Sequence, residues 1–597
     1  MESIPPLLLV VPLAGAALLR VPRLSASPRL SSTVAIAVPG LTAALALWLL
    51  PRVQTVPIVH WVGGWRFRDG LVVGIPLVAD GVATGLVAFA AVLTAAVMVH
   101  ASAAHLLRQA PFGVLTLLLL AAVSGIALVG DLFSMFVFIE LLGISIYALT
   151  AVKVHDVGTV PAAFNLATVS TIGAVAFLTG VSLVYGATGT PNLAEAGLRI
   201  VAAPEALPAS LTVGLGIMVA GLAIKAGLVP FHFAHADAHT AAMTPHAALF
   251  GAVAVPTALY AIARVVGVLA GPLAVGDVLR VGVMVLAVAT ALVGGVMALV
   301  QTHLKRLLAF SSVAHLGIAA VGVALGDVIA TTGVVVYVVG HGLVKTALFL
   351  AVGLVLHRTG SVDTNELAGR GREATPAVLL LAIGGPLLAG APPGGLHLGK
   401  VGMEVAAAEL GFSWVMAPVY LGAVLTGAAV LRAVVQLWWG GGVGTDPYGR
   451  VAEGAPETEL PPGRHPRAFV AVPVGLLLLG VVVPVVLAAG DATAGRSLAD
   501  ASGYAASVLE FDGEPSPAEA GILAAWGVQD LAKGLLAGGA AVLWGIAAVR
   551  GRPGTGSGYL EAPLRWVRVA HSGHLGDITM WATVGVASWC AWALLGT

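Results

Sequence analysis

The amino-acid sequence predicts an all-α, polytopic membrane protein. Of the 597 residues, 58% are hydrophobic and only 10% are charged, and the mean hydropathy is +0.99. In soluble domains about a quarter of the residues are charged, so this composition is not that of a soluble domain. Apolar segments of about 17–25 residues recur along the chain, and each is long enough to cross a bilayer. Lys plus Arg equals Asp plus Glu at 29 each, so no basic surplus indicates a nucleic-acid partner.

The hydropathy pattern predicts about sixteen spans, of which about the first fourteen form a compact core. The first segment has no basic leader and no cleavage site of small residues, so we expect a retained helix there. The expected ranges are 4–20, 31–50, 74–99, 112–130, 131–150, 161–186, 211–229, 245–268, 273–299, 307–325, 328–356, 375–394, 415–438, 468–489, 531–549 and 577–595.

The loops between these spans differ in charge. The odd-numbered loops carry most of the Lys and Arg residues, which by the positive-inside rule predicts that they are cytoplasmic and that both termini lie outside. Gly440 to Pro466 is rich in Gly, Pro and charge and is expected to be a cytoplasmic loop. Asp491 to Lys533, with acidic residues at 510, 512 and 514, is expected to be an external segment that can hold a short surface helix.

Two charges lie inside the predicted membrane spans of the first half. Glu140 is in the fifth span and Lys225 in the seventh, just before a break at Gly227 and Pro230. A lysine at the bilayer centre costs roughly 2.5–3.5 kcal/mol, and a nearby carboxylate lets both groups stay charged. We therefore expect Glu140 and Lys225 to pair and to mark an ion pathway. The alternative is a static ion pair that only fixes helix packing.

The second half repeats this arrangement. Lys400 follows a second break, in which Pro386, Pro392 and Pro393 interrupt an apolar run. Two broken helices, each with a lysine, in two five-helix blocks predict an internal repeat with an ion path near the repeat interface. The alternative for Lys400 is an interfacial lysine that reaches out to the membrane surface. The expected organisation is an N-terminal group of spans (1–111), a first repeat (112–268), a second repeat (273–438) and a C-terminal part (439–597).

Histidines offer relay groups between these lysines. His341 and Lys345 are spaced i, i+4 and therefore share one helix face. A histidine titrates near neutral pH and can pass protons, and His315 is a further candidate. An ordinary packed core histidine is the alternative for His341.

A third group of ionisable residues follows Lys225. His232, His235, Asp237 and His239 resemble a metal site superficially, but no HExxH motif or nearby cysteine accompanies them. We therefore expect no metal and assign His232, Asp237 and His239 to proton access or relay. The sequence also has no phosphate-binding loop, dinucleotide fingerprint or nucleophile elbow, and only one cysteine, so we expect no cofactor and no catalytic site in this chain.

Five stretches of the chain together resemble the antiporter-like family shared by respiratory complex I, Mrp-type cation/proton antiporters and membrane-bound hydrogenases. They are DLFSMFVFIELLGISIYAL, IKAGLVPFHFAHADAHTAAMTPHAAL, HLKRLLAFSSVAHLG, GHGLVKTALFLAVGLVLHRTG and LAGAPPGGLHLGK. The ending VRVAHSGHLGDITMWATVGVA is similar to the tail of the D-type subunits of Mrp complexes.

The resemblance implies fourteen core helices with two inverted five-helix repeats and proton translocation along a central polar axis. By motif position, it implies that Glu140 and Lys225 form the family's ion pair. It further implies that His341 and Lys345 form the relay of the eleventh helix and that Lys400 is the terminal lysine. Two positions depart from the family pattern: Pro256 stands where many relatives carry a bridging lysine, and His303 stands where an acidic residue is common.

Three functional hypotheses follow. The leading one is a proton-translocating subunit of a multi-subunit Na⁺/proton antiporter, resembling the D-type subunit of Mrp complexes. The second is a proton-pumping membrane subunit of a complex I-like NADH-quinone oxidoreductase or a membrane-bound hydrogenase. The third is a structural membrane subunit that has lost conduction, for which Pro256 is the reason. Each implies a plasma-membrane location and a hetero-oligomer with other membrane subunits and the lipid bilayer as partners, and no nucleic acid.

Overall fold

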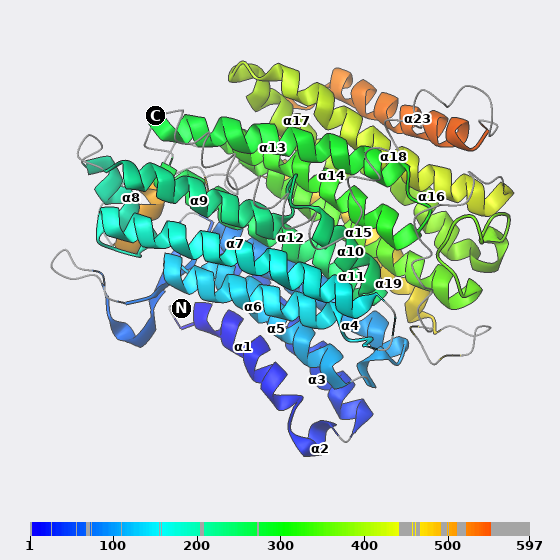
Figure 1. The fold of residues 1–597 in the computed structure, drawn as a ribbon, viewed down its shortest axis with the longest axis horizontal. Coiled ribbons are helices and arrows are strands. Elements are labelled where there is room, and N and C mark those ends of the chain that lie inside the picture. The colour runs from blue at the N-terminus through cyan, green and yellow to red at the C-terminus, as the bar shows by residue number, and fades with distance from the viewer. Residues whose placement is uncertain are drawn as a thin grey trace.

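The computed structural model is a bundle of long helices that lie nearly parallel to one another (Figure 1). It describes residues 3–25, 27–54, 56–66, 72, 74–108, 110–154, 156, 158–202, 208–270, 274–440, 457, 460, 466–490, 498, 501–509 and 521–550. Fourteen of the described helices are long and apolar enough to cross a membrane, so the prediction of an all-α polytopic protein is confirmed. The predicted span 577–595, the acidic residues 510, 512 and 514 and most of the 440–466 loop lie outside the described residues.

The N-terminal part holds the helices that precede the first break. The first predicted span is shorter than expected, because α1 has only 14 residues and is about 21 Å long. The helices are α1 (Pro5–Leu18), α2 (Pro22–Ser25), α3 (Pro28–Leu49), α4 (Gly81–Ala103), α5 (Ala110–Leu128), α6 (Leu132–Thr150), α7 (Thr159–Thr188) and α8 (Leu193–Ala202), with single turns at Leu50–Arg52, Val62–Gly64 and Leu106–Arg108.

The central and C-terminal helices contain both breaks. A π-helical segment, η5, joins α11 to α12, and a second one, η6, ends that span. The elements are α9 (Ala209–Ala226), α10 (Phe233–Ala241), α11 (Thr244–Leu249), η5 (Phe250–Ala254), α12 (Val255–Val265), η6 (Val266–Ala270), α13 (Ala274–Leu299), α14 (Leu304–Leu325), α15 (Val328–Thr359), α16 (Thr375–Ala389), α17 (Gly395–Glu409), α18 (Met416–Trp439), α19 (Ala468–Ala489), α21 (Ala501–Leu509), α22 (Ile522–Ala525) and α23 (Val528–Arg550), with single turns at Gly371–Ala374 and Ser413–Val415.

The two halves use the same packing device. The longest helices, α7 and α15, each pack against the half-helix that carries a lysine, α9 and α17 respectively. At the α7–α9 contact, a Cβ on Gly221 would lie 2.5 Å from the backbone oxygen of Gly173. At the α15–α17 contact, a Cβ on Gly399 would lie 2.5 Å from the backbone oxygen of Gly333. Small residues that let backbones approach are typical of membrane helix packing, and here they bring each lysine against a long helix.

A β-hairpin is a feature that the sequence analysis did not predict. β1 (Ile58–Trp61) pairs antiparallel with β2 (Pro76–Ala79), with Ile58 opposite Ala79 and Trp61 opposite Pro76. The hairpin lies at the same end of the bundle as the α5–α6 turn, because Leu77 forms a β-bridge with Val129. This end is the one that the loop charges predict to be external.

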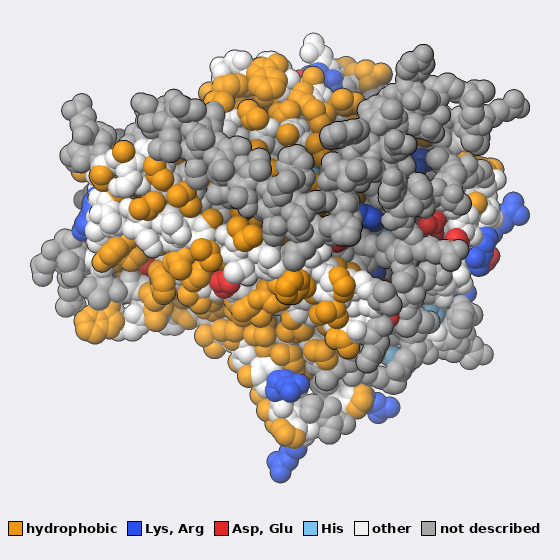
Figure 2. All heavy atoms as spheres, viewed as in Figure 1, with side chains coloured by type: hydrophobic (Ala, Val, Ile, Leu, Met, Phe, Trp, Pro, Cys, Tyr) orange, Lys and Arg blue, Asp and Glu red, His pale blue; other side chains and the backbone are white. Residues whose placement is uncertain are grey.

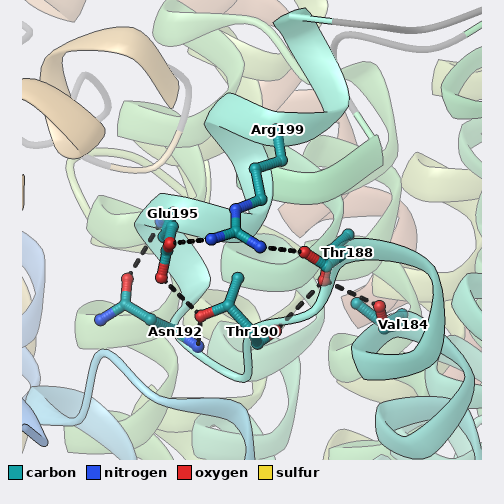
Figure 3. Close-up of polar contacts among 6 residues, drawn as sticks. All are labelled: Val184, Thr188, Thr190, Asn192, Glu195 and Arg199. Carbon is teal, nitrogen blue, oxygen red and sulfur yellow. Dashed lines mark hydrogen bonds and ion pairs between the residues drawn. The ribbon is translucent and has the colours of Figure 1, made fainter. Parts of the chain in front are cut away.

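A polar network fixes the α7–α8 connection at the same end (Figure 3). The Arg199 guanidinium lies between the Glu195 carboxylate and the Thr188 backbone oxygen, to which it donates at 2.6 Å. The other Glu195 oxygen accepts the Thr190 hydroxyl at 2.7 Å, and Asn192 caps the backbone N–H of Glu195. Because Asn192 also bridges to Asp131, this network holds the start of α6, the helix that carries Glu140.

His303 caps α14 at the opposite end of the bundle. Its Nδ1 accepts the backbone N–H of Arg306, so the histidine fills the capping role of the acidic residue expected there. Burial, together with the nearby cations Lys305 and Arg306, lowers the pKa of His303 to about 3. The ring is therefore neutral at physiological pH and keeps the lone pair that the cap requires.

The rim of the bundle is apolar. In Figure 2, orange apolar side chains cover large parts of the described surface and charged groups are sparse. The outer helices α19 and α23 are each only 28% buried over their most apolar stretch. The predicted external segment does contain a short helix, α21, but that helix is packed rather than exposed, because it contacts α8 and buries Tyr504.

Candidate functional site

The first break separates α9 from α10 directly after Lys225. α9 ends at Ala226, and Gly227 adopts a left-handed conformation with φ of 73°. The break leaves backbone groups that need partners. The Thr290 hydroxyl of α13 accepts the Val229 N–H at 2.9 Å, and the His235 ring hydrogen-bonds to the backbone of Ile224. Polar side chains therefore gather at the point where the helix stops.

The predicted contact between Glu140 and Lys225 is confirmed. The Lys225 Nζ lies 2.8 Å from the Glu140 Oε1 and donates to the Ser170 hydroxyl at 2.8 Å. The Glu140 side chain is 31% exposed, whereas that of Lys225 is 8% exposed. Gly143, one helical turn after Glu140, leaves the space for this contact, because a Cβ there would lie 3.3 Å from the Lys225 Nζ.

A small cavity adjoins this pair. Lys225, Ser170, His235 and Phe250 line it. Its remaining walls are mainly aliphatic side chains of α5, α6, α7, α9, η5 and α12. The cavity therefore joins the lysine of α9 to His235 of α10 with space that water can enter.

The histidine run after Lys225 forms the buried half-helix α10. His232, His235 and His239 are 1%, 5% and 1% exposed. The His239 Nδ1 lies 2.7 Å from the His235 carbonyl oxygen, and its ring stacks on Phe250 at 4.1 Å. These rings therefore lie inside the bundle rather than in a solvated loop.

Two further facts describe the same run. Asp237 points to the end that the loop charges predict to be cytoplasmic, where it pairs with Arg306 at 3.4 Å. Within the described part of the chain, no three His, Cys, Asp or Glu side chains come together in a way that could hold a metal ion.

The span that contains Pro256 forms the wall between two cavities. Phe250 and Ala254 face the cavity beside Lys225, whereas Gly251 and Pro256 line a second, smaller cavity. Ser312, His315 and His341 also line this second cavity. A Cβ on Gly251 would meet the His239 Nε2 at 3.0 Å and the Ser312 hydroxyl at 2.9 Å. The missing side chain at Gly251 thus lets groups from α10 and α14 approach each other past the π-helical turn.

Lys345 is completely buried on α15. Its Nζ donates to the Ser311 hydroxyl at 2.7 Å and to the Leu308 backbone oxygen at 3.1 Å. His341, one turn earlier on the same face, has an Nε2 without a hydrogen-bond partner among the described residues.

His315 lies at the centre of the second half. Its Nδ1 is 2.6 Å from the Tyr337 hydroxyl and its Nε2 is 3.0 Å from the Thr426 hydroxyl. Its ring centroid is 4.9 Å from that of His341. His315 is also within electrostatic range of both Lys345 and Lys400. The structure therefore gives it a more central place than its sequence context indicated.

Lys400 lies directly after the second break. Pro386 stays inside α16, and the break falls at Gly390 to Gly394 instead. The Lys400 Nζ donates to the Ala389 backbone oxygen at 3.0 Å and lies 4.6 Å from the centre of the Tyr420 ring. The side chain is 0% exposed, so the alternative of an interfacial lysine is wrong. The end of a helix and an aromatic face both favour a cation, which compensates in part for its burial.

Several polar groups that contact the ionisable residues were not identified from the sequence. Hydroxyl groups contact Lys225, Lys345 and His315, and no signal in the sequence singled them out. They are Ser170, Ser311, Ser312, Tyr337 and Thr426.

Another buried cluster lies at the predicted cytoplasmic end. The Glu457 carboxylate accepts the Thr244 backbone N–H at 2.9 Å and pairs with Lys305 at 3.1 Å. Burial raises the pKa of Glu457, but the cations Lys305 and Lys153 outweigh it and lower that pKa to about 2. Glu457 is therefore ionised at any physiological pH and anchors its loop to the start of the span that contains Pro256.

Comparison with known proteins gives consistent similarities. Residues 129–426 match the protein family described as NADH:quinone oxidoreductase/Mrp antiporter, TM. The chain is 32% identical over 445 residues to NADH-quinone oxidoreductase subunit N of Desulforudis audaxviator. The aligned region covers 72% of this chain and 85% of that protein.

Two solved structures share the fold. A chain of the Mrp complex from Dietzia sp. DQ12-45-1b superposes with a TM-score of 0.73 at 28% identity, covering 85% of this chain and 99% of that chain. A chain of the membrane-bound sulfane sulfur reductase, an archaeal respiratory membrane complex, superposes with a TM-score of 0.71 at 27% identity, covering 85% and 100%.

Proposed function

The chain belongs to the NADH:quinone oxidoreductase/Mrp antiporter family of membrane subunits, and from this we propose that it translocates protons in a redox-driven, complex I-like assembly. Its relatives named NADH-quinone oxidoreductase subunit N favour this function over the Mrp-type antiporter that the sequence analysis ranked first. The observation that carries the proposal is a row of buried ionisable groups with a lysine at each broken helix.

The first half-channel centres on Lys225. With Glu140 at 2.8 Å, the ammonium is stabilised by several kcal/mol at an effective dielectric constant of about 20. Moving the partly exposed Glu140 side chain away removes that stabilisation, so the Lys225 ammonium then releases its proton more readily. Glu140 is thus the switch and Lys225 is the carrier.

The connection to the second half runs through histidines rather than through a lysine at position 256. A proton leaving Lys225 crosses the water-sized space to His235, and His239 then presents its Nε2 towards Ser312 beside Gly251. Pro256 cannot carry a proton, but its place in the wall of the second cavity leaves room for water there. Pro256 therefore no longer supports the third hypothesis, a non-conducting subunit.

The second half-channel begins at Lys345. From there the row continues through His341 and His315 to Lys400, with the Tyr337 and Thr426 hydroxyls as hydrogen-bonding partners of His315. Each step joins groups that can both hold and release a proton. The proposed repeats that contain the two half-channels are residues 112–268 and 273–438.

The energy source lies in other subunits. This chain carries no motif for a redox cofactor, so partner subunits supply the electron transfer that moves Glu140. The proposed location is the plasma membrane, in a complex with other membrane subunits. A second candidate function, Na⁺/proton antiport, is supported by the structural similarity to a chain of the Mrp complex.

Transport by the complete complex in inverted membrane vesicles tests this proposal. We expect NADH to acidify the vesicle lumen, Lys225→Ala to abolish the acidification, and sodium salts to leave an imposed pH gradient intact. Arg370→Gln is the matched control, because that arginine forms an exposed ion pair with Glu373 away from the row.

Two other outcomes would overturn the proposal. Dissipation of the gradient by sodium in a Lys225-dependent manner would establish the antiporter function instead. Acidification by Lys225→Ala at the wild-type rate would show that this lysine is structural.

A further inference from the structure

The external end of the second half-channel contains charged groups from α23 as well as those of α17 and α18. α23 packs against α18 and α16, and it lies at one edge of the bundle (Figure 1). Its Lys533 Nζ lies 2.6 Å from the Glu404 Oε1 of α17 and 3.2 Å from the Asp530 Oδ1. A helix beyond the predicted fourteen-helix core therefore completes the surroundings of a carboxylate next to Lys400.

Glu404 is tied to Lys400 in two ways. The two residues are spaced i, i+4 on α17, so they share one helix face. The Tyr420 ring lies under the Lys400 ammonium at 4.6 Å, and its hydroxyl donates to the Glu404 Oε2 at 2.9 Å. One tyrosine thus contacts both the terminal lysine and the carboxylate.

The exposed fraction of the side chain increases along this group of residues. Lys400 is 0% exposed, the Glu404 side chain 27% and the Lys533 side chain 39%. The loop that follows α17 is one of those that the distribution of basic residues predicts to be external. The group therefore connects the buried end of the row with the outer membrane surface.

We propose that Glu404 is the proton-release group of the second half-channel and that Lys533 of α23 positions its carboxylate. The proposal rests on the proposed function. The Lys400 ammonium gives one proton, across a bridging water, to the Glu404 carboxylate, which leaves a neutral amine and a neutral acid. Glu404 then loses that proton to external water and becomes a carboxylate again, while Lys533 stays protonated throughout. His315 returns a proton to Lys400 for the next cycle.

Lys533 places a positive charge beside the release group. Its ammonium pairs with the Glu404 carboxylate, and a fixed positive charge there repels protons that approach from an acidic exterior. The other titratable or charged groups around Glu404 in the described chain are few. They are Lys400 and His397 on α17, Tyr420 on α18 and Asp530 on α23.

The test follows the acidification of inverted vesicles that contain the complete complex, with the lumen buffered at a series of pH values. We expect Glu404→Gln to slow NADH-driven acidification by roughly tenfold, as for loss of a positioned proton-transfer group. Lys533→Gln should match wild type in an alkaline lumen and fall behind as the lumen becomes acidic, and Lys533→Arg should restore the wild-type profile.

A purely structural ion pair predicts a different result. In that case Lys533→Gln would change the amount of assembled complex but not the dependence of acidification on lumenal pH, and the proposal would be overturned. Because Lys533 is partly exposed, its variants test the proposal even if Glu404→Gln fails to assemble.

Lys225→Ala in the same vesicles separates the two proposals. If it abolishes acidification while the Glu404 and Lys533 variants behave as wild type, only the release proposal fails. If all three variants acidify normally, the proposed function fails as well.

Discussion

Two ion pairs inside the bundle differ at the residue scale in how tightly the protein encloses them. Asp80 and Arg264 lie 2.5 Å apart with side chains 1% and 3% exposed, and Arg264 also contacts the rings of Tyr260 and Tyr504. Glu140 is 31% exposed and contacts Lys225, which lines a cavity. Protein therefore encloses the Asp80–Arg264 pair, whereas the partly exposed Glu140 carboxylate has space to move away from Lys225.

This difference predicts different costs for neutralising each acid. Asp80→Asn leaves the Arg264 guanidinium buried without its counter-ion, which typically costs about 3–5 kcal/mol. Glu140→Gln keeps the Ser170 hydroxyl as an acceptor for Lys225 and leaves a group that water can reach. The temperature of half-unfolding of the purified complex should therefore fall much further for Asp80→Asn. Equal losses for both variants would show that the Glu140 pair is structural.

The proposed histidine connection gives a second prediction. We expect His239→Gln to lower NADH-driven proton translocation by about tenfold or more, because glutamine accepts hydrogen bonds but does not relay protons near neutral pH. His357→Gln is the matched control, since His357 is also buried on a spanning helix but packs against Phe469 and lines neither cavity. If both variants translocate alike, the route between the halves avoids His239.

Only part of this site could be predicted from the sequence. The pairing of Glu140 with Lys225 was predictable because no other strong charges share their depth in the first half. The Asp80–Arg264 pair was not, because both residues lie near span ends, where a charge is ordinary. The partners of Lys400 depend on how a broken helix folds back, and Glu404–Lys533 joins residues 129 positions apart with no local signal.

At the scale of the helices, the glycines at the two breaks leave the space that the functional side chains occupy. Both breaks begin with a left-handed glycine, Gly227 with φ of 73° and Gly390 with φ of 96°. Gly227 packs against the His235 ring, and Gly390 packs against the end of the Lys400 side chain. The sequence predicted the two breaks from Gly and Pro. Pro392 and Pro393 do lie in the second break, whereas Pro386 is tolerated within α16.

Substitution of Gly390 should therefore affect function more than stability. Alanine at a left-handed position costs about 1–2 kcal/mol, and a Cβ there would lie 2.2 Å from the Lys400 Nζ and displace the ammonium from the Ala389 carbonyl. Gly360 ends α15 with φ of 77° and has nothing within 4 Å of an added Cβ, so Gly360→Ala carries the same strain without the clash. Proton translocation should fall strongly in Gly390→Ala and little in Gly360→Ala, at similar thermal stability.

At the scale of the whole molecule, the polar groups gather at the two opposite ends of the bundle. The start of α14, the end of α15 and Glu457 meet at one end, where Lys305 and Arg306 lie. The hairpin, the α7–α8 network and the Asp80–Arg264 pair gather at the other end, around Asp131. Between them the surface is apolar, and α19 and α23 are mostly uncovered. Lipid or the neighbouring membrane subunits of a family member would cover these outer faces.

Because the two ends differ, the orientation of the chain in the membrane can be tested directly. The positive-inside rule puts Arg372 in the cytoplasm, together with Lys305 and Arg306, and puts Ser413 outside. Both side chains are exposed, and the only native cysteine, Cys590, can be replaced by serine without adding another thiol.

In intact cells, a membrane-impermeant thiol reagent should therefore label Ser413→Cys in the Cys590→Ser background and leave Arg372→Cys unlabelled until the cells are broken. The reverse pattern would place Glu404 and Lys533 in the cytoplasm. These two residues would then lie at the side from which protons are taken, and the release step proposed for them would have to be abandoned even if both are needed for transport.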